Sequence, residues 1–282
     1  MNEVRLNGIT MHLAEVPPQA DGPRYGATAV LIHGIAPDNL ASWYLTLAYP
    51  LASLGMRVLM YDLRGHGRTE RPRTGYRFAD LLDDLDALML HWAVDGPVHL
   101  IGNSLGGALA FGYAARRPER VAGIVAIEAD TPTAGYFDRL SQVVDALTLV
   151  PDDGRPTASG PRELLRKPQV LALLNETSIR RELPAGPAPD PDRLAAVDCP
   201  VLCLYGARSP VRRRAPATRR LLPQARTMVF ADQQHTLLMD DHREVREHVL
   251  AWLLQPPSDP VAGHVAGPSD ERAAPADPRS SA

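Results

Sequence analysis

Ser104 lies in the pattern Gly-x-Ser-x-Gly (residues 102–106), between an apolar stretch and a helical pattern of small residues. A strand that turns directly into a helix strains its connecting residue, and flanking glycines let the neighbouring backbone approach closely. The serine is then exposed at a helix N-terminus, which favours developing negative charge. The pattern predicts a nucleophile at Ser104. The alternative is a glycine-rich turn with an incidental serine.

A nucleophilic serine that attacks a carbonyl group also needs an oxyanion hole and a base. An oxyanion hole needs two converging backbone N–H groups. Leu105, directly after the serine, can supply one, and Ile35 in the loop "HGIAPDN" can supply the other. His33, which opens that loop, is interpreted as a structural residue. His235 is the predicted base, because it follows the last expected strand, at the edge of the sheet that Ser104 faces.

The elements that must position these residues alternate between strand-length apolar runs and helical patterns. This alternation predicts an α/β fold: a mostly parallel, eight-stranded sheet with helices on both faces. The expected strands span 4–6, 11–16, 27–33, 57–61, 98–102, 121–127, 201–205 and 226–230. Helical patterns span 78–93, 105–117 and 242–254, and in the first of these Leu81, Leu85, Leu88 and Trp92 share one side, with acids opposite.

Two regions depart from this alternation. Residues 131–195 contain helical stretches joined by Pro-, Asp- and Gly-rich connectors, which predicts a helical lid rather than a plain long crossover. Residues 256–282 lack periodicity and predict a disordered tail. The expected organisation is therefore a core in two parts, 1–130 and 196–255, with the lid between them.

The motifs "HGIAP", "YDLRGHGRT", "GNSLGGALAFGYAARRPERV" and "DQQHTLLMD" occur in this order. With the helical insertion, they make the chain similar to the α/β-hydrolase superfamily up to about residue 254. The resemblance implies that Ser104 is the nucleophile, that His235 is the general base, and that Ile35 and Leu105 form the oxyanion hole. It implies no metal and no organic cofactor.

The acid of the expected triad is missing from its usual place. In most members of this superfamily an aspartate follows the strand "VLCLYG", but Ser209 stands there and cannot carry the charge. Glu128, at the end of the strand before the lid, resembles the acid of the haloalkane dehalogenase branch. Asp130 is the second candidate, and Asp232 remains open. The alternative is that Glu128 pairs with a lid arginine and the triad is incomplete.

The nucleophile type limits the reaction. Dehalogenases and epoxide hydrolases of this superfamily attack with an aspartate, whereas a serine indicates acyl chemistry. The sequence therefore predicts a serine hydrolase of the esterase or thioesterase type, acting on a small to medium hydrophobic molecule. Alternatives are a lyase, cyclase or acyltransferase of a natural-product pathway (secondary metabolism), a C–C bond hydrolase of the meta-cleavage type, and a non-catalytic binding module.

The overall composition argues against some classes of binding partner. A net charge of −3 and a content of 5% aromatic residues argue against nucleic-acid binding. The sequence contains no apolar run of about 18 residues, so no membrane-spanning segment is expected. The N-terminus lacks a secretory pattern, and Cys199 and Cys203 do not form a disulfide framework, so a cytoplasmic location is expected. The arginines at 212–214 are interpreted as a solvated face. The alternative is docking of an acyl carrier protein.

Overall fold

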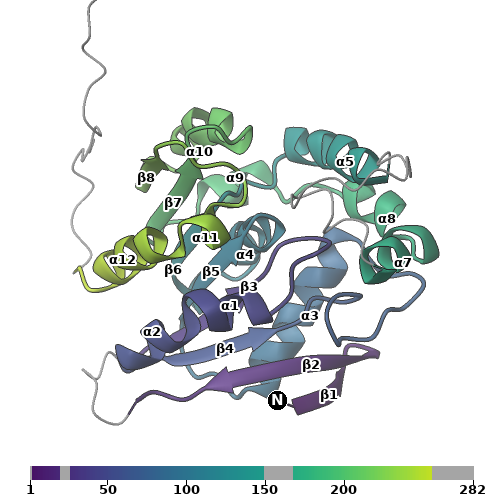
Figure 1. Ribbon diagram of the computed structural model, residues 1–282, viewed down its shortest axis with the longest axis horizontal. Coiled ribbons are helices and arrows are strands. Elements are labelled where there is room, and N and C mark those ends of the chain that lie inside the picture. Colours follow the sequence, from purple (N-terminus) through teal and green to yellow (C-terminus); the bar gives the residue numbers. More distant parts are fainter. Residues whose placement is uncertain (1, 20–25, 149–167, 256–282) are drawn as a thin grey trace, which may run out of the picture.

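The computed structural model describes residues 2–19, 26–148 and 168–255 (Figure 1). The predicted tail and part of the predicted lid lie outside the described residues. Each of the eight expected strands is present, with bounds that differ by a few residues at most from the expected ones. They are β1 (Asn2–Leu6), β2 (Ile9–Val16), β3 (Thr28–Ile32), β4 (Arg57–Tyr61), β5 (Val98–Asn103), β6 (Val121–Ile127), β7 (Val201–Gly206) and β8 (Ala225–Phe230).

The strands form one sheet in the order β1-β2-β4-β3-β5-β6-β7-β8. β1 pairs with β2, and β2 with β4, in antiparallel fashion, and all the other pairs are parallel. Every residue of β7 is buried, as expected for a parallel strand covered on both faces. Because β3 to β8 run in the same direction, the segments that follow them meet at one edge of the sheet.

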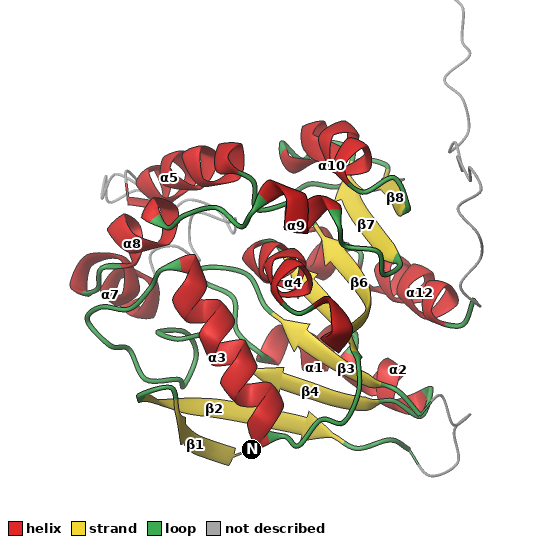
Figure 2. Ribbon diagram, turned by 180° about the vertical axis from the view of Figure 1, so that it is seen from behind, coloured by secondary structure: helices red, strands yellow, loops and turns green. Residues whose placement is uncertain are grey.

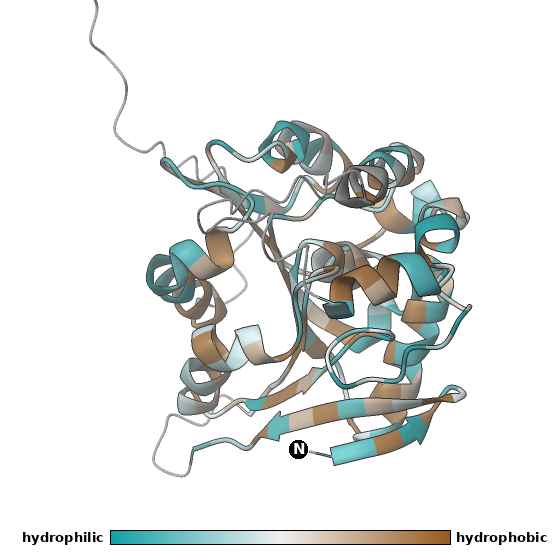
Figure 3. Cartoon of the chain, turned by 45° about the vertical axis from the view of Figure 1, so that its right-hand side comes forward, coloured by the Kyte–Doolittle hydropathy of each residue, from teal (hydrophilic) through white to brown (hydrophobic). Residues whose placement is uncertain are grey.

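Helices cover both faces of the sheet and divide the hydrophobic core into two clusters. Figure 1 shows the face covered by α1 (Ala41–Thr46), α2 (Ala48–Ser53), α11 (Leu237–Asp240) and α12 (His242–Leu253), here called the first face, and Figure 2 shows the opposite, second face. In Figure 3, hydrophobic residues run through the central strands and hydrophilic residues gather on the outer helices. The second face carries α3 (Phe78–His91), α4 (Leu105–Arg116), α9 (Pro191–Ala195) and α10 (Ala215–Leu221).

The α3 helix follows its predicted pattern with one exception. Leu81, Leu85, Leu88 and Trp92 are buried, as the helical spacing predicts. Asp84 is also buried, although the acids of this helix were expected on the solvent side. Arg64, in the turn after β4, pairs with it at 2.5 Å. A partner far away in sequence therefore compensates the charge, and helical periodicity carries no information about such a partner.

Four described helices fall within the predicted lid, residues 131–195: α9 packs on the sheet side against α4, and the other three are α5 (Ala134–Thr148), α7 (Pro168–Glu176) and α8 (Ile179–Ala185). Figure 2 shows these last three helices grouped beyond the ends of the parallel strands. Glu182 of α8 accepts the backbone N–H groups of Gly75 and Tyr76 at 2.8 and 2.7 Å. This contact ties the lid to the segment before α3. In the described part of the chain, no helix is long and apolar enough to cross a membrane.

Candidate active site

The predicted functional residues follow strands that end at the same edge of the sheet. Asn103, the last residue of β5, pairs with Ile127 of β6, and Ile127 pairs with Leu204 of β7. Ser104 and Glu128 therefore leave adjacent strands at the same level. His235 lies in the connection between β8 and α11.

The turn at Ser104 has the strained backbone that its sequence pattern predicts. Ser104 has φ 51° and ψ −113°, and its side chain does not cap α4. A Cβ atom on Gly106 would lie 1.9 Å from the carbonyl oxygen of Ile32, and one on Gly102 would lie 2.3 Å from the Gly106 backbone. Both glycines are therefore required by close backbone approach, and the hydroxyl of Ser104 is left to interact with other groups.

His235 connects Ser104 to Glu128. Its Nε2 atom lies 3.0 Å from the Ser104 hydroxyl, and its Nδ1 atom lies 3.1 Å from Oε2 of Glu128. A histidine placed between a hydroxyl and a carboxylate can take the proton of the hydroxyl while the carboxylate stabilises the imidazolium. The side chain of His235 is 46% exposed and that of Glu128 is fully buried. The geometry is that of a serine, histidine and acid triad with the acid on β6.

Glu128 is held by donors from the turn after β7. The backbone N–H of Gly206 donates to Oε1, and the hydroxyl of Ser209 donates to Oε2. Burial of a carboxylate is costly unless hydrogen bonds compensate the loss of water. Each oxygen of the Glu128 carboxylate accepts a hydrogen bond from this turn. The contact between Ser209 and Glu128 was not predicted from the sequence. Its proximity to Glu128 depends on the pairing of β6 with β7.

The other candidate acids are engaged elsewhere. Asp130 forms ion pairs with Arg139 of α5 and with Arg214, the latter at 3.6 Å. Asp232 pairs with Arg208 at 2.5 Å. Of the three carboxylates weighed from the sequence, Glu128 is the one in contact with His235. Two arginines of the segment after β7, Arg208 and Arg214, are thus paired with acids of the same chain.

Positive φ angles mark the same edge of the sheet. The left-handed region costs a non-glycine residue about 1–2 kcal/mol and persists where the surrounding structure enforces it, often at functional sites. Of the six non-glycine residues with positive φ in the described part, four belong to segments that build the site: Ala36, Ser104, Glu128 and Asp232. Backbone strain therefore identifies the same location as the side-chain chemistry does.

Two histidines hold the loop after β3, where the second oxyanion donor is expected. The Nδ1 atom of His33 lies 2.7 Å from the carbonyl oxygen of Gly34, and its Nε2 atom accepts a backbone N–H from the turn after β4. His66 accepts the N–H of Ala36 at 3.0 Å. Ile35 is thus fixed on both sides. His33 binds the loop backbone as predicted, whereas the role of His66 was not predicted.

Asp38 connects this loop to the turn at Ser104. It accepts the N–H of Gly34 at 2.7 Å and the side-chain amide of Asn103 at 3.1 Å. Burial acts to raise the pKa of Asp38, but the electrostatic interaction with the nearby His33 and the hydrogen bond from the Gly34 N–H bring this pKa below its usual value. The sequence signal for Asp38 is weak: a short acid in the turn "PDN". Leu105 begins α4, where the first N–H groups lack intrahelical acceptors.

The burial of His66 predicts a pH dependence of folding. Burial, together with the electrostatic interaction with His33, lowers the pKa of His66 to about 3. The unfolded chain binds this proton near pH 6.5 and the folded chain does not, so stability falls as the pH drops from about 6.5 towards 3. His66→Gln removes this contribution. In urea denaturation at pH 7, 6 and 5, the variant should lose less stability per pH unit than the wild type, by up to about 1.4 kcal/mol; equal slopes would contradict the prediction.

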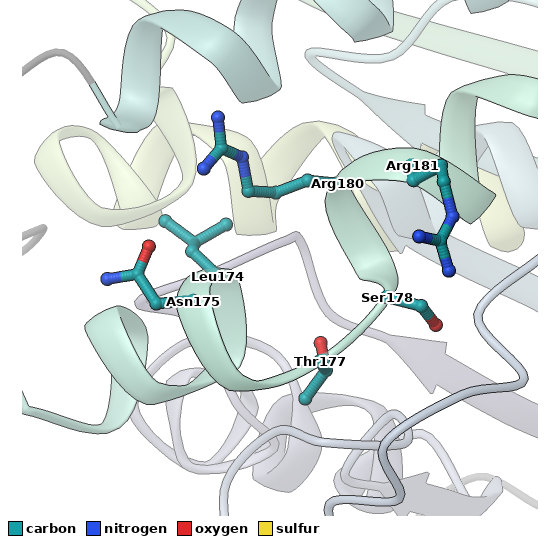
Figure 4. Close-up of a pocket in the computed structure, with 6 residues that line it drawn as sticks. All are labelled: Leu174, Asn175, Thr177, Ser178, Arg180 and Arg181. Atoms are coloured by element: carbon teal, nitrogen blue, oxygen red, sulfur yellow. The ribbon is translucent and has the colours of Figure 1, made fainter.

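Two pockets lie outside this cluster of residues. One, of about 390 Å³, is formed at the junction of α7 and α8 of the lid (Figure 4). The other, of about 620 Å³, lies between α3, α4 and residues 187–193. Neither is lined by Ser104 or His235. Among the described residues, no group of three or more His, Cys, Asp or Glu side chains could hold a metal ion.

Comparisons with known proteins agree with the fold. A family model described as "alpha/beta hydrolase fold" matches residues 29–242. A Bacillus subtilis protein named "AB hydrolase superfamily protein YfhM" is 34% identical over 131 residues, which are 46% of this chain and 43% of that protein. An epoxide hydrolase of Siraitia grosvenorii is 32% identical over 124 residues, 43% of this chain and 36% of that protein. The matched segment thus covers less than half of either relative.

A solved structure matches over a longer stretch. A thermophilic esterase from Thermogutta terrifontis superposes with a TM-score of 0.68 and 24% identity, covering 90% of this chain and 98% of that one. At this level of identity the match shows a common fold and leaves the reaction to be argued from the site itself.

Proposed function

Since the chain belongs to the α/β-hydrolase fold family, we propose that it is a serine hydrolase that cleaves a carboxylic ester or thioester through an acyl-enzyme on Ser104. The observation that supports this proposal is the position of His235, 3.0 Å from the Ser104 hydroxyl and 3.1 Å from Glu128. An activated serine hydroxyl is the nucleophile of acyl transfer. The esterase among the structural matches favours an ester as substrate. The apolar residues of α7 in the lid favour a small to medium hydrophobic molecule.

The proposed reaction has two halves. In the first, Ser104 attacks the carbonyl carbon, its proton passes to Nε2 of His235, and Glu128 stabilises the imidazolium. The N–H groups of Leu105 and Ile35 stabilise the oxyanion. The intermediate then collapses, and His235 returns the proton to the departing alcohol or thiol. In the second half a water molecule attacks the acyl-enzyme, with His235 as base, and releases the acid and free Ser104.

The proposed nucleophile, a serine, argues against epoxide opening, the reaction named for the relative from Siraitia grosvenorii. The superfamily members that open epoxides attack with an aspartate, and this chain has Ser104 at that position. A serine attacking an epoxide would leave an ether, which this machinery could not hydrolyse, whereas a serine ester is readily cleaved by water. Ester or thioester cleavage therefore fits the residues better than epoxide opening does.

A fluorophosphonate tests the proposal without knowledge of the substrate, because it reacts with a serine that a base activates. The full-length protein is incubated with the probe and its intact mass is followed over time. We expect one adduct, located on Ser104 by peptide mapping, and none in Ser104→Ala. Absence of an adduct on the wild type, or an adduct elsewhere, would overturn the proposal. Acyl esters and acyl thioesters of increasing chain length then define the substrate class.

A further inference from the structure

We propose that Ser209 is a positioning residue: its hydroxyl holds the carboxylate of Glu128 in the orientation that meets His235. The inference rests on the proposed function, and it gives a role to a residue that neither touches the reacting atoms nor carries a charge. Ser209 stands where most members of this superfamily carry the acid itself.

The contacts of Glu128 support this role. Glu128 directly follows β6 with φ 52° and has a fully buried side chain. Its Oε2 atom accepts the Ser209 hydroxyl and is also the atom 3.1 Å from Nδ1 of His235. Ser209 and His235 thus converge on a single oxygen. Without the Ser209 hydroxyl, His235 would be the one remaining partner of Oε2 in the described part of the chain, while Oε1 would still accept the Gly206 N–H.

The hydroxyl of Ser209 is itself fixed before it meets Glu128. Ser209 is buried, and its N–H donates to the carbonyl oxygen of Gly206 at 3.1 Å, which closes the turn. The N–H of Val211 donates to the Ser209 hydroxyl oxygen at 3.2 Å. The oxygen therefore acts as acceptor towards Val211 and as donor towards Glu128, which a serine can do simultaneously.

The chemistry of the turn explains why a neutral donor suits this position. An aspartate at 209 would bring a second negative charge against Glu128 in a buried site, and like charges at that distance cannot both ionise without a large cost. Once the acid lies on β6, the turn after β7 must supply hydrogen-bond donors instead. Gly206 and Ser209 supply one each.

The same turn also contacts the loop that carries His235. The N–H of Arg208 donates to the carbonyl oxygen of Gln233 at 2.9 Å. A Cβ atom on Gly206 would lie 2.4 Å from that oxygen, so this close approach requires glycine. The turn from Gly206 to Ser209 therefore lies between the acid and the loop of the base, where it can set the spacing of both.

The test is a double-mutant cycle on the rate at which a fluorophosphonate labels Ser104 in the full-length protein. Loss of a hydrogen bond to a charged group predicts that Ser209→Ala slows labelling by about 10- to 100-fold. Ser209→Thr keeps the hydroxyl and should recover most of the rate. In a Glu128→Gln background, Ser209→Ala should have little further effect, because the hydroxyl acts through the carboxylate.

A matched control removes another buried hydroxyl from the segment that follows β7. Thr218→Val on α10 should label at the wild-type rate. Wild-type labelling of Ser209→Ala, or losses that multiply in the double variant, would overturn the role of Ser209 and leave the proposed function standing. If Ser209→Ala does not fold, Ser209→Cys, which has only a weak donor, gives the same measurement. A wild type that is not labelled at all would instead overturn the proposed function.

Discussion

Glu128→Gln is expected to slow the reaction of Ser104 with a fluorophosphonate by about 10³- to 10⁴-fold. Glutamine preserves the shape of the side chain but cannot stabilise the imidazolium that forms when His235 takes the serine proton. It also has only one acceptor oxygen for the donors at Gly206 and Ser209, so its amide group faces a donor. The measurement is the rate of adduct formation by intact mass, with thermal unfolding to show that the variant is folded.

Asp130→Asn is the matched control for this prediction. Asp130 lies two residues further along and pairs with Arg139 and Arg214, so its replacement should change the labelling rate far less. A large loss in Asp130→Asn and none in Glu128→Gln would show that Asp130 is the acid. Equal rates in both variants and the wild type would show that His235 works without a carboxylate.

Asp84→Asn is expected to lower the free energy of unfolding by about 3–5 kcal/mol. Arg64 and Asp84 are both almost fully buried, with 6% and 2% of their side chains exposed, and their atoms approach to 2.5 Å. Asparagine keeps the volume but leaves the guanidinium charge without a counter-charge in a site that water does not reach. Urea denaturation monitored by circular dichroism measures the change.

The neighbouring residue Asp83 provides the control for the ion pair. Asp83, on the same helix as Asp84, pairs with Arg116 of α4 at 2.6 Å, but the side chains of Asp83 and Arg116 are 46% and 36% exposed. Solvent screens such a pair, so Asp83→Asn should change the stability by no more than about 1 kcal/mol. If the two variants lost the same stability, the burial of the Arg64–Asp84 pair would not be the cause of its effect.

Much of the fold could be predicted because its signals are local. A parallel strand buried on both faces must be an apolar run, and α3 must repeat its leucines at helical spacing to cover the sheet. The turn at Ser104 requires glycines on either side, since a side chain at Gly106 would collide with the backbone of β3. These requirements fall on neighbouring residues, so they can be recognised in the sequence without any knowledge of tertiary contacts.

The sheet, a candidate nucleophile at Ser104, a candidate base at His235 and a short set of candidate acids could therefore be predicted from local patterns. The tertiary structure adds that, of Glu128, Asp130 and Asp232, it is Glu128 that contacts His235, because the pairing of β6 with β7 and of β7 with β8 aligns the segments that follow these strands. The pairing of β6 with β7 also brings Ser209 to Glu128, and Asp84 of α3 is buried against Arg64 from the turn after β4. Such contacts join residues far apart in the chain, and their distances are set by strand pairing and helix packing, which no local pattern encodes.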